Sequence, residues 1–464
     1  MSMSSPPGAS LRDGLVAIVG AQHVRNDPAA LEVYATDATP LHRGHPDVIC
    51  FPGSTAEVQQ VVRLASALST PLIVRGAGTN LSAATVPQAG GIVLVMTRMK
   101  RLLELDTANM TAVVQPGLPT SVLADAATAA GLLYPPDPGS RTTSTIGGNV
   151  ATCAGGLRGL KYGVTRDYVL GCEAVLGTGE VIRTGGKLVK DVAGFDLTRL
   201  LCGSEGTLAV LTELTMKLVP APRSYRVGLA YFDRLAPAGA AVSRALANGI
   251  LPATLEFLDA TCLRTVEAYA HVGLRTDAGA LLLFGQDGDR ETVDRDLLFI
   301  EDACRREGAI EVRVAADDAE AARLLEARRA ALPSLSRLAP LTILEDATVP
   351  RSRLAEMVER IEEIAHRHDL LIGTFGHAGD GNLHPTCVVD PAQEGVLGRV
   401  DSALAEIFAA AIELGGTITG EHGVGLAKRP FLHAQLGSAH MSLLRRIKSA
   451  FDPEGILNPG KLGS

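Results

Sequence analysis

The stretch that decides the fold is Arg75-Gly76-Ala77-Gly78-Thr79-Asn80-Leu81-Ser82, which directly follows the apolar run of residues 71–75. The apolar run predicts a buried strand. The glycines after it allow successive backbone N–H groups to converge on one anion, and the polar side chains add donors. This pattern suits a pyrophosphate, although a plain glycine turn between strands accounts for it almost as well. It is not the G-x-G-x-x-G pattern of Rossmann folds.

Two further clusters of glycine, proline and small polar residues occur in the first half of the chain. Their prolines fix an extended backbone and their glycines let the chain pass close to a large planar ligand. The second cluster runs through Pro135-Pro136-Asp137-Pro138-Gly139-Ser140, Ser144-Thr145-Ile146-Gly147-Gly148-Asn149, Ala154-Gly155-Gly156 and Lys161-Tyr162-Gly163, and the third is Gly203-Ser204-Glu205-Gly206-Thr207-Leu208.

In this order, the three clusters resemble the FAD-binding domain of the vanillyl-alcohol oxidase family, also called the FAD-linked oxidase or PCMH-type superfamily, over residues 46–221. The resemblance implies that the first loop holds the FAD pyrophosphate and that the others surround the diphosphate and isoalloxazine. Some members attach the flavin to a histidine of the first loop. Thr79 takes that position here, so the resemblance implies non-covalent FAD. It assigns cofactor binding to Arg75, Gly76, Ala77, Gly78, Thr79, Asn80, Leu81, Ser82, Pro138, Ser144, Thr145, Gly148, Asn149, Thr152, Gly155, Gly156, Tyr162, Gly163, Glu205, Gly206 and Asn458.

The order of the expected elements indicates an α+β protein. We expect one or two short helices in residues 1–45, the FAD-binding domain in 46–221, a substrate (cap) domain in 222–420 and a C-terminal segment in 421–464. The resemblance implies a two-part PCMH-type FAD domain, a ferredoxin-like antiparallel sheet in the cap, and a C-terminal helical segment that returns to the flavin. Gly455-Ile456-Leu457-Asn458-Pro459-Gly460-Lys461 has P-loop spacing, but Leu462 replaces the required Ser or Thr, so we expect a turn.

The strongest chemical signal is the pair of loops His377-Ala378-Gly379-Asp380-Gly381-Asn382-Leu383-His384 and Gly420-Glu421-His422-Gly423. Two histidines and a glutamate are a frequent ligand set for a catalytic divalent metal with an open position. A lone histidine is usually solvated or a satisfied core group, but three in two glycine loops favour a metal. A structural zinc site is the alternative, although it would normally have four protein ligands and only three good ones are present.

These loops resemble the C-terminal domain of D-lactate dehydrogenases, D-2-hydroxyglutarate dehydrogenases and the FAD-linked subunit of glycolate oxidase. The resemblance implies that His377, His384 and Glu421 bind zinc, manganese or iron, and that His422 is the catalytic base. It aligns Arg328 with an arginine that holds the substrate carboxylate. A solvated helix position is an equally good explanation for Arg328, and Arg329 is the other candidate.

The expected reaction is the oxidation of a D-2-hydroxy acid, namely D-lactate, glycolate or D-2-hydroxyglutarate, to the 2-oxo acid by hydride transfer to FAD. One alternative is a non-catalytic FAD subunit of a glycolate-oxidase-like complex, which would lack the histidine loops. Another is a non-redox flavoenzyme like alkyl-glycerone-phosphate synthase. The stretch Lys187–Leu201 looks closer to the dehydrogenases.

Composition limits the partners. The net charge of −8 and a pI near 5.8 give no reason to expect nucleic acid. Seven scattered cysteines without C-x-x-C fit the cytoplasm and exclude clustered iron–sulfur ligands, so electrons must leave to a quinone, an electron-transfer flavoprotein, a cytochrome or an iron–sulfur subunit. No apolar run is long enough to span a membrane, although a quinone acceptor would bring the protein to the membrane surface. The resemblance also suggests a homodimer.

Overall fold

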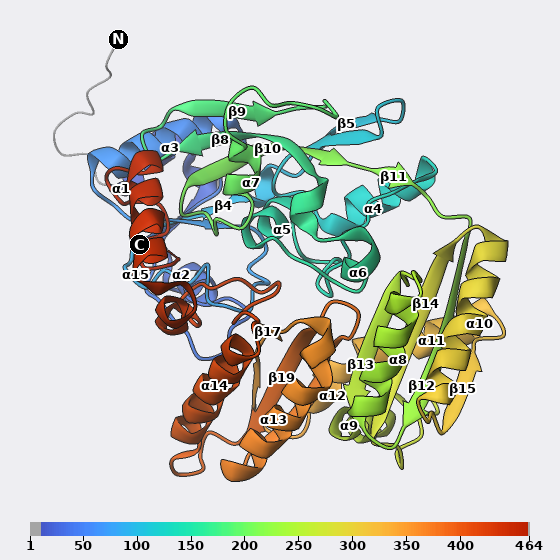
Figure 1. Cartoon of the computed structure of the whole chain (residues 1–464). Coiled ribbons are helices and arrows are strands. Elements are labelled where there is room, and N and C mark those ends of the chain that lie inside the picture. Colours follow the sequence, from blue (N-terminus) through green and yellow to red (C-terminus); the bar gives the residue numbers. More distant parts are fainter. Residues whose placement is uncertain (1–10, 463–464) are drawn as a thin grey trace.

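The computed structural model describes residues 11–462. Figure 1 shows two lobes: an N-terminal lobe (residues 11–221), blue to green, and a cap lobe (residues 222–420), light green through yellow to dark orange. The C-terminal segment (residues 421–462), red, returns to the N-terminal lobe. No helix among the described residues is long and apolar enough to cross a membrane.

The first sheet of the N-terminal lobe has the order β1-β2-β4-β3, with β4 parallel to both β2 and β3. All four residues of β4 are buried, as expected for a parallel strand covered on both faces. Ser54 caps the helix that follows β2 by accepting a hydrogen bond from the Glu57 N–H at 3.2 Å. The elements are α1 (Leu11–Val19), β1 (Val24–Arg25), α2 (Pro28–Tyr34), β2 (Val48–Cys50), α3 (Thr55–Ala67), β3 (Leu72–Arg75) and β4 (Ile92–Val95).

The second sheet is antiparallel, with the order β5-β6-β10-β8-β9. β8 and β9 form a hairpin across a turn in which Gly179 has a φ of +78°. The elements are β5 (Leu102–Asp106), β6 (Thr111–Val114), α4 (Thr120–Ala129), α5 (Ile146–Thr152), α6 (Gly159–Tyr162), β8 (Val169–Leu176), β9 (Val181–Gly185), α7 (Leu197–Leu201) and β10 (Ala209–Lys217), with β7 (Leu132–Leu133) pairing β11 (Val219–Pro220).

The cap lobe contains one antiparallel sheet of the order β15-β12-β14-β13-β18-β19-β16, with β17 added to β19. Its first four strands follow the order 4-1-3-2 of a ferredoxin-like βαββαβ unit. The strands are β12 (Ser224–Phe232), β13 (Thr254–Asp259), β14 (Ala280–Gly288), β15 (Glu311–Val314), β16 (Leu341–Leu344), β17 (Ala347–Thr348), β18 (Leu371–His377) and β19 (Asn382–Val389).

Helices cover both faces of this sheet. The face that carries Phe257 packs on α8 (Leu235–Ala247), α10 (Arg290–Arg306), α13 (Leu354–Arg367) and α14 (Val396–Glu413). The face that carries Leu258 packs on α9 (Ala260–Ala270), α11 (Asp318–Arg329) and α12 (Ala331–Leu335). Successive strand residues therefore point into different helical layers. The apolar stripe of α13 faces this sheet, with Leu354, Val358 and Ile361 buried.

The C-terminal segment ties the lobes together through α15 (Arg429–Phe451) and the turn after it. Phe431 packs against the cap core, whereas Phe451 packs against the N-terminal lobe. In the turn, the Asn458 side-chain amide donates to the carbonyls of Ala84 and Glu205, at 2.9 and 2.7 Å. The sequence motif that resembled a P-loop is therefore a turn that closes on the glycine loops of the N-terminal lobe.

Candidate active site

A cavity of about 1170 Å³ lies where the two lobes and the C-terminal segment meet. This volume exceeds that of most sites for a single small ligand, so it has room for a dinucleotide together with a small substrate. Among the predicted cofactor residues, those that line the cavity are Arg75, Gly76, Ala77, Gly78, Thr79, Asn80, Leu81, Pro138, Thr145, Gly148, Asn149, Thr152, Gly156, Glu205 and Gly206.

The other predicted cofactor residues do not line the cavity, and most support its walls. The Ser82 hydroxyl donates to the carbonyl of His422 at 3.0 Å, Ser144 bonds to Thr120, and the Tyr162 hydroxyl donates to Asp287 of the cap lobe at 2.7 Å. Asn458 is buried in the turn described above, and Gly163 ends α6. Gly155 has its role in packing, because a Cβ there would lie 2.6 Å from a carboxylate oxygen of Glu421.

The N-terminal helical segment also contributes to the cavity, which the sequence did not indicate. Thr36, Asp37 and Ala38 line it. The Arg75 guanidinium lies 5.2 Å from the centre of the Tyr34 ring and donates to the Thr36 carbonyl at 2.6 Å. Arg75 therefore holds this segment against the first glycine loop, in addition to lining the cavity itself.

The strand register of the cap sheet brings the histidines together. His377 ends β18 and His384 lies on β19, and the two strands form a hairpin through the glycine loop. Both side chains point to the α9/α11/α12 face, and their ring centres are 5.2 Å apart. Glu421 enters from the C-terminal segment, with Oε1 3.2 Å from Nε2 of His377 and 3.3 Å from Nε2 of His384.

Glu256 on β13 is the residue that the sequence analysis missed. It pairs in register with His377 and points to the same face. Its Oε1 lies 2.7 Å from Nδ1 of His377, and its Oε2 accepts a 2.6 Å hydrogen bond from Nε of Arg328. The only signal in the sequence was a charged residue in the middle of the apolar strand Thr254–Asp259.

Of the two candidate arginines, Arg328 is the one directed inward. Its side chain is 11% exposed and its guanidinium lies 4.7 Å from the centre of the Phe375 ring, whereas the side chain of Arg329 is 59% exposed. Both residues reach the cavity wall. Arg328 thus lies next to the histidine cluster, joined to it through Glu256.

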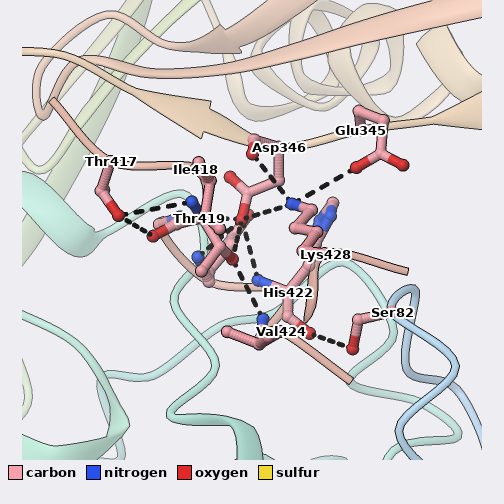
Figure 2. A network of polar contacts seen from close by, with 12 residues as sticks. Ser82, Glu345, Asp346, Thr417, Ile418, Thr419, His422, Val424 and Lys428 are labelled. Atoms are coloured by element: carbon pink, nitrogen blue, oxygen red, sulfur yellow. Dashed lines mark hydrogen bonds and ion pairs between the residues drawn. The ribbon is translucent and has the colours of Figure 1, made fainter. Parts of the chain in front are cut away.

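Asp346, at the end of the cap sheet, shapes the loop that carries Glu421 and His422 (Figure 2). Its Oδ2 accepts hydrogen bonds from the backbone N–H groups of residues 420–422 at 2.8–3.0 Å and from the Thr419 hydroxyl at 2.7 Å. The fully buried Lys428 donates to the Asp346 carbonyl and lies 3.4 Å from Glu345. The His422 ring stacks on that of His384, with centres 5.1 Å apart.

The electrostatics of the cluster favour a cation between its carboxylates. Burial works against a charged His377, but Glu256 and Glu421 raise its pKa well above the ordinary value. Burial likewise opposes ionisation of Glu421, yet His377 and His384 lower its pKa well below the ordinary value. Burial lowers the pKa of His422 to about 4, with His384 and Lys428 adding to the effect and Asp346 opposing it. His422 is therefore neutral at pH 7.

The donor set fits a divalent metal. His377, His384 and Glu421 each offer a ligand atom, and these atoms lie within 4.8 Å of one another; the same holds for Asp346, His384 and His422. Among the described residues, Nδ1 of His384, Nδ1 of His422 and Oδ1 of Asp346 are buried without a hydrogen-bond partner. Buried polar atoms of this kind cost about 1–3 kcal/mol each unless another partner binds them.

The conformation and position of the first glycine loop suit a flavin nucleotide. Gly78 has a φ of +76°, a conformation that favours glycine, and the Gly76–Ser82 loop leaves the carboxyl end of β3. Thr145 caps α5 and lies directly beside the loop, because a Cβ on Gly76 would lie 2.3 Å from its hydroxyl oxygen. The N-terminus of a helix and the loop therefore line one cavity.

Two family models cover most of the chain. A model described as "FAD binding domain" matches residues 46–185, and one described as "FAD linked oxidases, C-terminal domain" matches residues 221–462. The chain belongs to the FAD-linked oxidases. The two matches also confirm the predicted family.

Full-length relatives are similar along almost the whole FAD-linked oxidase chain. The "Glycolate oxidase subunit GlcD" of Bacillus subtilis is 51% identical, over 97% of this chain and 96% of its own length. A "D-lactate dehydrogenase" of Anaerostipes hadrus is 36% identical, over 90% of each chain. These relatives confirm that the protein is an enzyme, an FAD-linked oxidoreductase.

A solved structure of p-cresol methylhydroxylase with bound substrate has the same fold. Its TM-score is 0.81 at 16% identity, over 98% of this chain and 96% of that one. The predicted PCMH-type fold is therefore confirmed, and the cavity of this FAD-linked oxidase lies between an FAD domain and a cap of known architecture.

Proposed function

We propose that the protein oxidises glycolate or D-lactate to the corresponding 2-oxo acid, with non-covalently bound FAD as electron acceptor and a divalent metal at His377, His384 and Glu421. One observation carries the proposal: Glu256 joins Arg328 to His377. A carboxylate anchor and a metal-binding cluster are thereby fixed side by side in one cavity, as a substrate with adjacent carboxylate and hydroxyl groups requires.

Arg328 is the residue that binds the substrate carboxylate. Its hydrogen bond to Glu256 uses Nε, so the two terminal nitrogens remain for a bidentate contact with the substrate. Phe375 lies under the guanidinium and restricts its movement. A guanidinium fixed in this way loses less conformational entropy when the substrate binds.

His422 is the base that takes the proton of the 2-hydroxyl group. Its backbone is fixed by Asp346 and Ser82, and its ring lies against His384. A bound metal would lower the pKa of the substrate hydroxyl, as it does for bound water. FAD would accept the hydride that leaves the α-carbon.

The wall around Arg328 favours a small substrate. Leu332, Leu344 and Phe375 line the cavity there. Apolar side chains suit the methyl group of lactate or the hydrogen of glycolate. The relatives named as a glycolate oxidase subunit and a D-lactate dehydrogenase favour the same two acids over D-2-hydroxyglutarate.

The relatives named as subunits support a further part of the proposal, that this chain passes its electrons to a partner subunit or another acceptor such as a quinone. We place the activity in the cytoplasm, including its membrane surface, because all seven cysteines are free thiols.

The deciding experiment is an anaerobic visible spectrum of the purified protein before and after the addition of glycolate, D-lactate, L-lactate or D-2-hydroxyglutarate. We expect glycolate or D-lactate to bleach the flavin bands, and acid denaturation to release the flavin. Metal analysis before and after chelation tests the second cofactor. Bound flavin that no acid bleaches would contradict the proposal and favour a non-catalytic subunit or a non-redox flavoenzyme.

A further inference from the structure

Two of the free cysteines lie next to each other, directly behind residues that line the cavity. Cys153 follows α5, with a φ of +54°, and Cys202 follows α7. Backbone hydrogen bonds of 2.8 Å from Gly203 to Val150, and from Glu205 to Ala151, join the segments that carry them. The two side chains lie close together, because a Cβ on Gly203, the residue after Cys202, would lie 3.6 Å from the Cys153 Cβ, and the two thiol groups interact electrostatically.

Cys153 also has a cationic neighbour. Nε of Arg166 lies 3.2 Å from its sulfur. Interaction with the Cys202 thiol lowers the pKa of Cys153 to about 6, and Arg166 lowers it further against the effect of burial. The same interaction raises the pKa of Cys202 far above its ordinary value. The guanidinium beside Cys153 therefore favours a thiolate there, next to the neutral Cys202 thiol, which is the reactive combination for disulfide chemistry.

The remaining cysteines lack these features. Burial raises the pKa of each of them: Cys50, Cys172, Cys262, Cys304 and Cys387. Buried neutral thiols of this kind are inert. Oxidation by a mild oxidant would therefore be selective for the pair.

The position of the pair connects it to the cavity. Thr152 and Ala154, on either side of Cys153, line the cavity, and so do Ser204 and Glu205 after Cys202. A disulfide requires a sulfur–sulfur distance of about 2.05 Å, which is much shorter than a non-bonded contact between thiols. Closing the bond would draw the two cavity-lining loops together.

We propose that Cys153 and Cys202 form a peroxide-sensitive dithiol whose oxidation to a disulfide lowers the turnover of the enzyme. Formation of the disulfide rests on the placement of Cys153, Cys202 and Arg166, whereas its effect on turnover rests on the proposed flavin site. The Cys153 thiolate attacks hydrogen peroxide, which breaks the O–O bond and gives a sulfenic acid and, after protonation, water. The Cys202 thiol then displaces the sulfenic oxygen as a second water. Peroxide gains the two electrons that the two sulfur atoms lose.

The experiment treats the flavin-loaded full-length protein with a small molar excess of hydrogen peroxide. Free thiols are then blocked and the peptides are mapped by mass spectrometry without reduction. We expect a peptide cross-linked between Cys153 and Cys202, a several-fold loss of turnover, and recovery of both with dithiothreitol. Cys202→Ser removes the resolving thiol, so it should give no cross-link and a trappable sulfenic acid at Cys153. Cys304→Ser is the matched control and should behave as the unmodified chain.

The two halves fail separately. If no Cys153–Cys202 peptide forms while the flavin remains bound, the dithiol is excluded, whatever the substrate of the enzyme. A cross-link that leaves turnover unchanged excludes control of the active site. If no hydroxy acid is turned over, the mapped cross-link and its loss in Cys202→Ser still decide the thiol chemistry. Reversible inactivation of Cys202→Ser without a sulfenic acid at Cys153 would also overturn the proposal.

Discussion

Glu256 and Arg328 form a buried ion pair in which Nε of the arginine lies 2.6 Å from one carboxylate oxygen, while the other oxygen contacts His377. The Glu256 carboxylate is 1% exposed, so its contacts with Arg328 and His377 replace the hydrogen bonds to water that it loses on burial. Orientation of the substrate anchor and orientation of the metal ligand therefore depend on the same side chain.

Replacement of Glu256 by glutamine should impair both functions. A glutamine side chain has one carbonyl oxygen and one NH2 group. Its oxygen can accept a hydrogen bond from either His377 or Arg328, but its NH2 group then faces the remaining partner, which is also a donor. We expect metal affinity to fall by about 10–100-fold and KM for the hydroxy acid to rise by a similar factor. Metal titration and steady-state kinetics measure the two effects. Glu213→Gln, at a partly exposed ion pair with Arg183, should change neither. Unchanged KM and metal affinity would show that Glu256 only packs.

The two overlapping ligand groups can be separated by substitution. Glu421→Gln removes the anionic ligand of the His377 group, so bound metal should fall to about a tenth or less of the unmodified level. Asp346→Asn keeps an oxygen that can accept the hydrogen bonds of residues 419–422, so metal content should change little. Elemental analysis of both proteins gives the answer. The reverse result would place the metal at Asp346, His384 and His422 and would remove His422 from the role of base.

His422 should be required for turnover but not for cofactor binding. Loss of a general base costs about 10²–10⁴-fold in rate. We expect His422→Asn to lower kcat by such a factor, with flavin and metal content unchanged and KM little affected. His433→Asn changes an exposed histidine of α15 and serves as the control. Near-normal turnover of the loaded His422→Asn protein would assign the base to another residue.

The sequence predicted the parts of the site that are continuous in the chain. The glycine loop 75–82 and the histidine loop 377–384 each occupy eight consecutive residues, so their residue types and spacing are visible without the fold. Glu256 and Asp346 could not be found in this way. Glu256 is a carboxylate inside an apolar strand, Asp346 lies between β16 and β17, and their partners lie about 70–120 positions away in the sequence.

The arrangement of the lobes was predictable only through resemblance. Side chains alternate between the two faces of a strand, and this alternation places Glu256, His377 and His384 on the face covered by α11. The sequence alone could not show this, because the pairing of β13 with β18 must be known first. The same limit applies to the N-terminal segment, where β1 joins the first sheet and Thr36 reaches the cavity. The Cys153–Cys202 contact likewise depends on the packing of α5 against the loop after α7.

Lys461 should make folding stability depend on pH in the alkaline range. Its side chain is 1% exposed and its ammonium group donates to the Val86 carbonyl at 2.6 Å. Burial lowers its pKa to about 8, against the opposing charges of Asp37 and Glu205. The folded protein thus binds this proton less tightly than the unfolded chain, whose lysine titrates near 10.5. The contribution of Lys461 to stability is therefore full above pH 10.5 and is lost as the pH falls through 8.

Substitution of Lys461 by methionine removes this titration. We compare the free energy of unfolding of Lys461→Met with that of the unmodified protein. The difference should shift in favour of the variant between pH 10 and pH 7, by up to about 3 kcal/mol. The lost hydrogen bond to Val86 adds an offset that does not depend on pH. Urea unfolding at several pH values measures the difference. Lys100→Met, at an exposed lysine, should show no such trend. A pH-independent difference for Lys461→Met would mean that the buried ammonium keeps its ordinary pKa, held by its partners in the C-terminal turn.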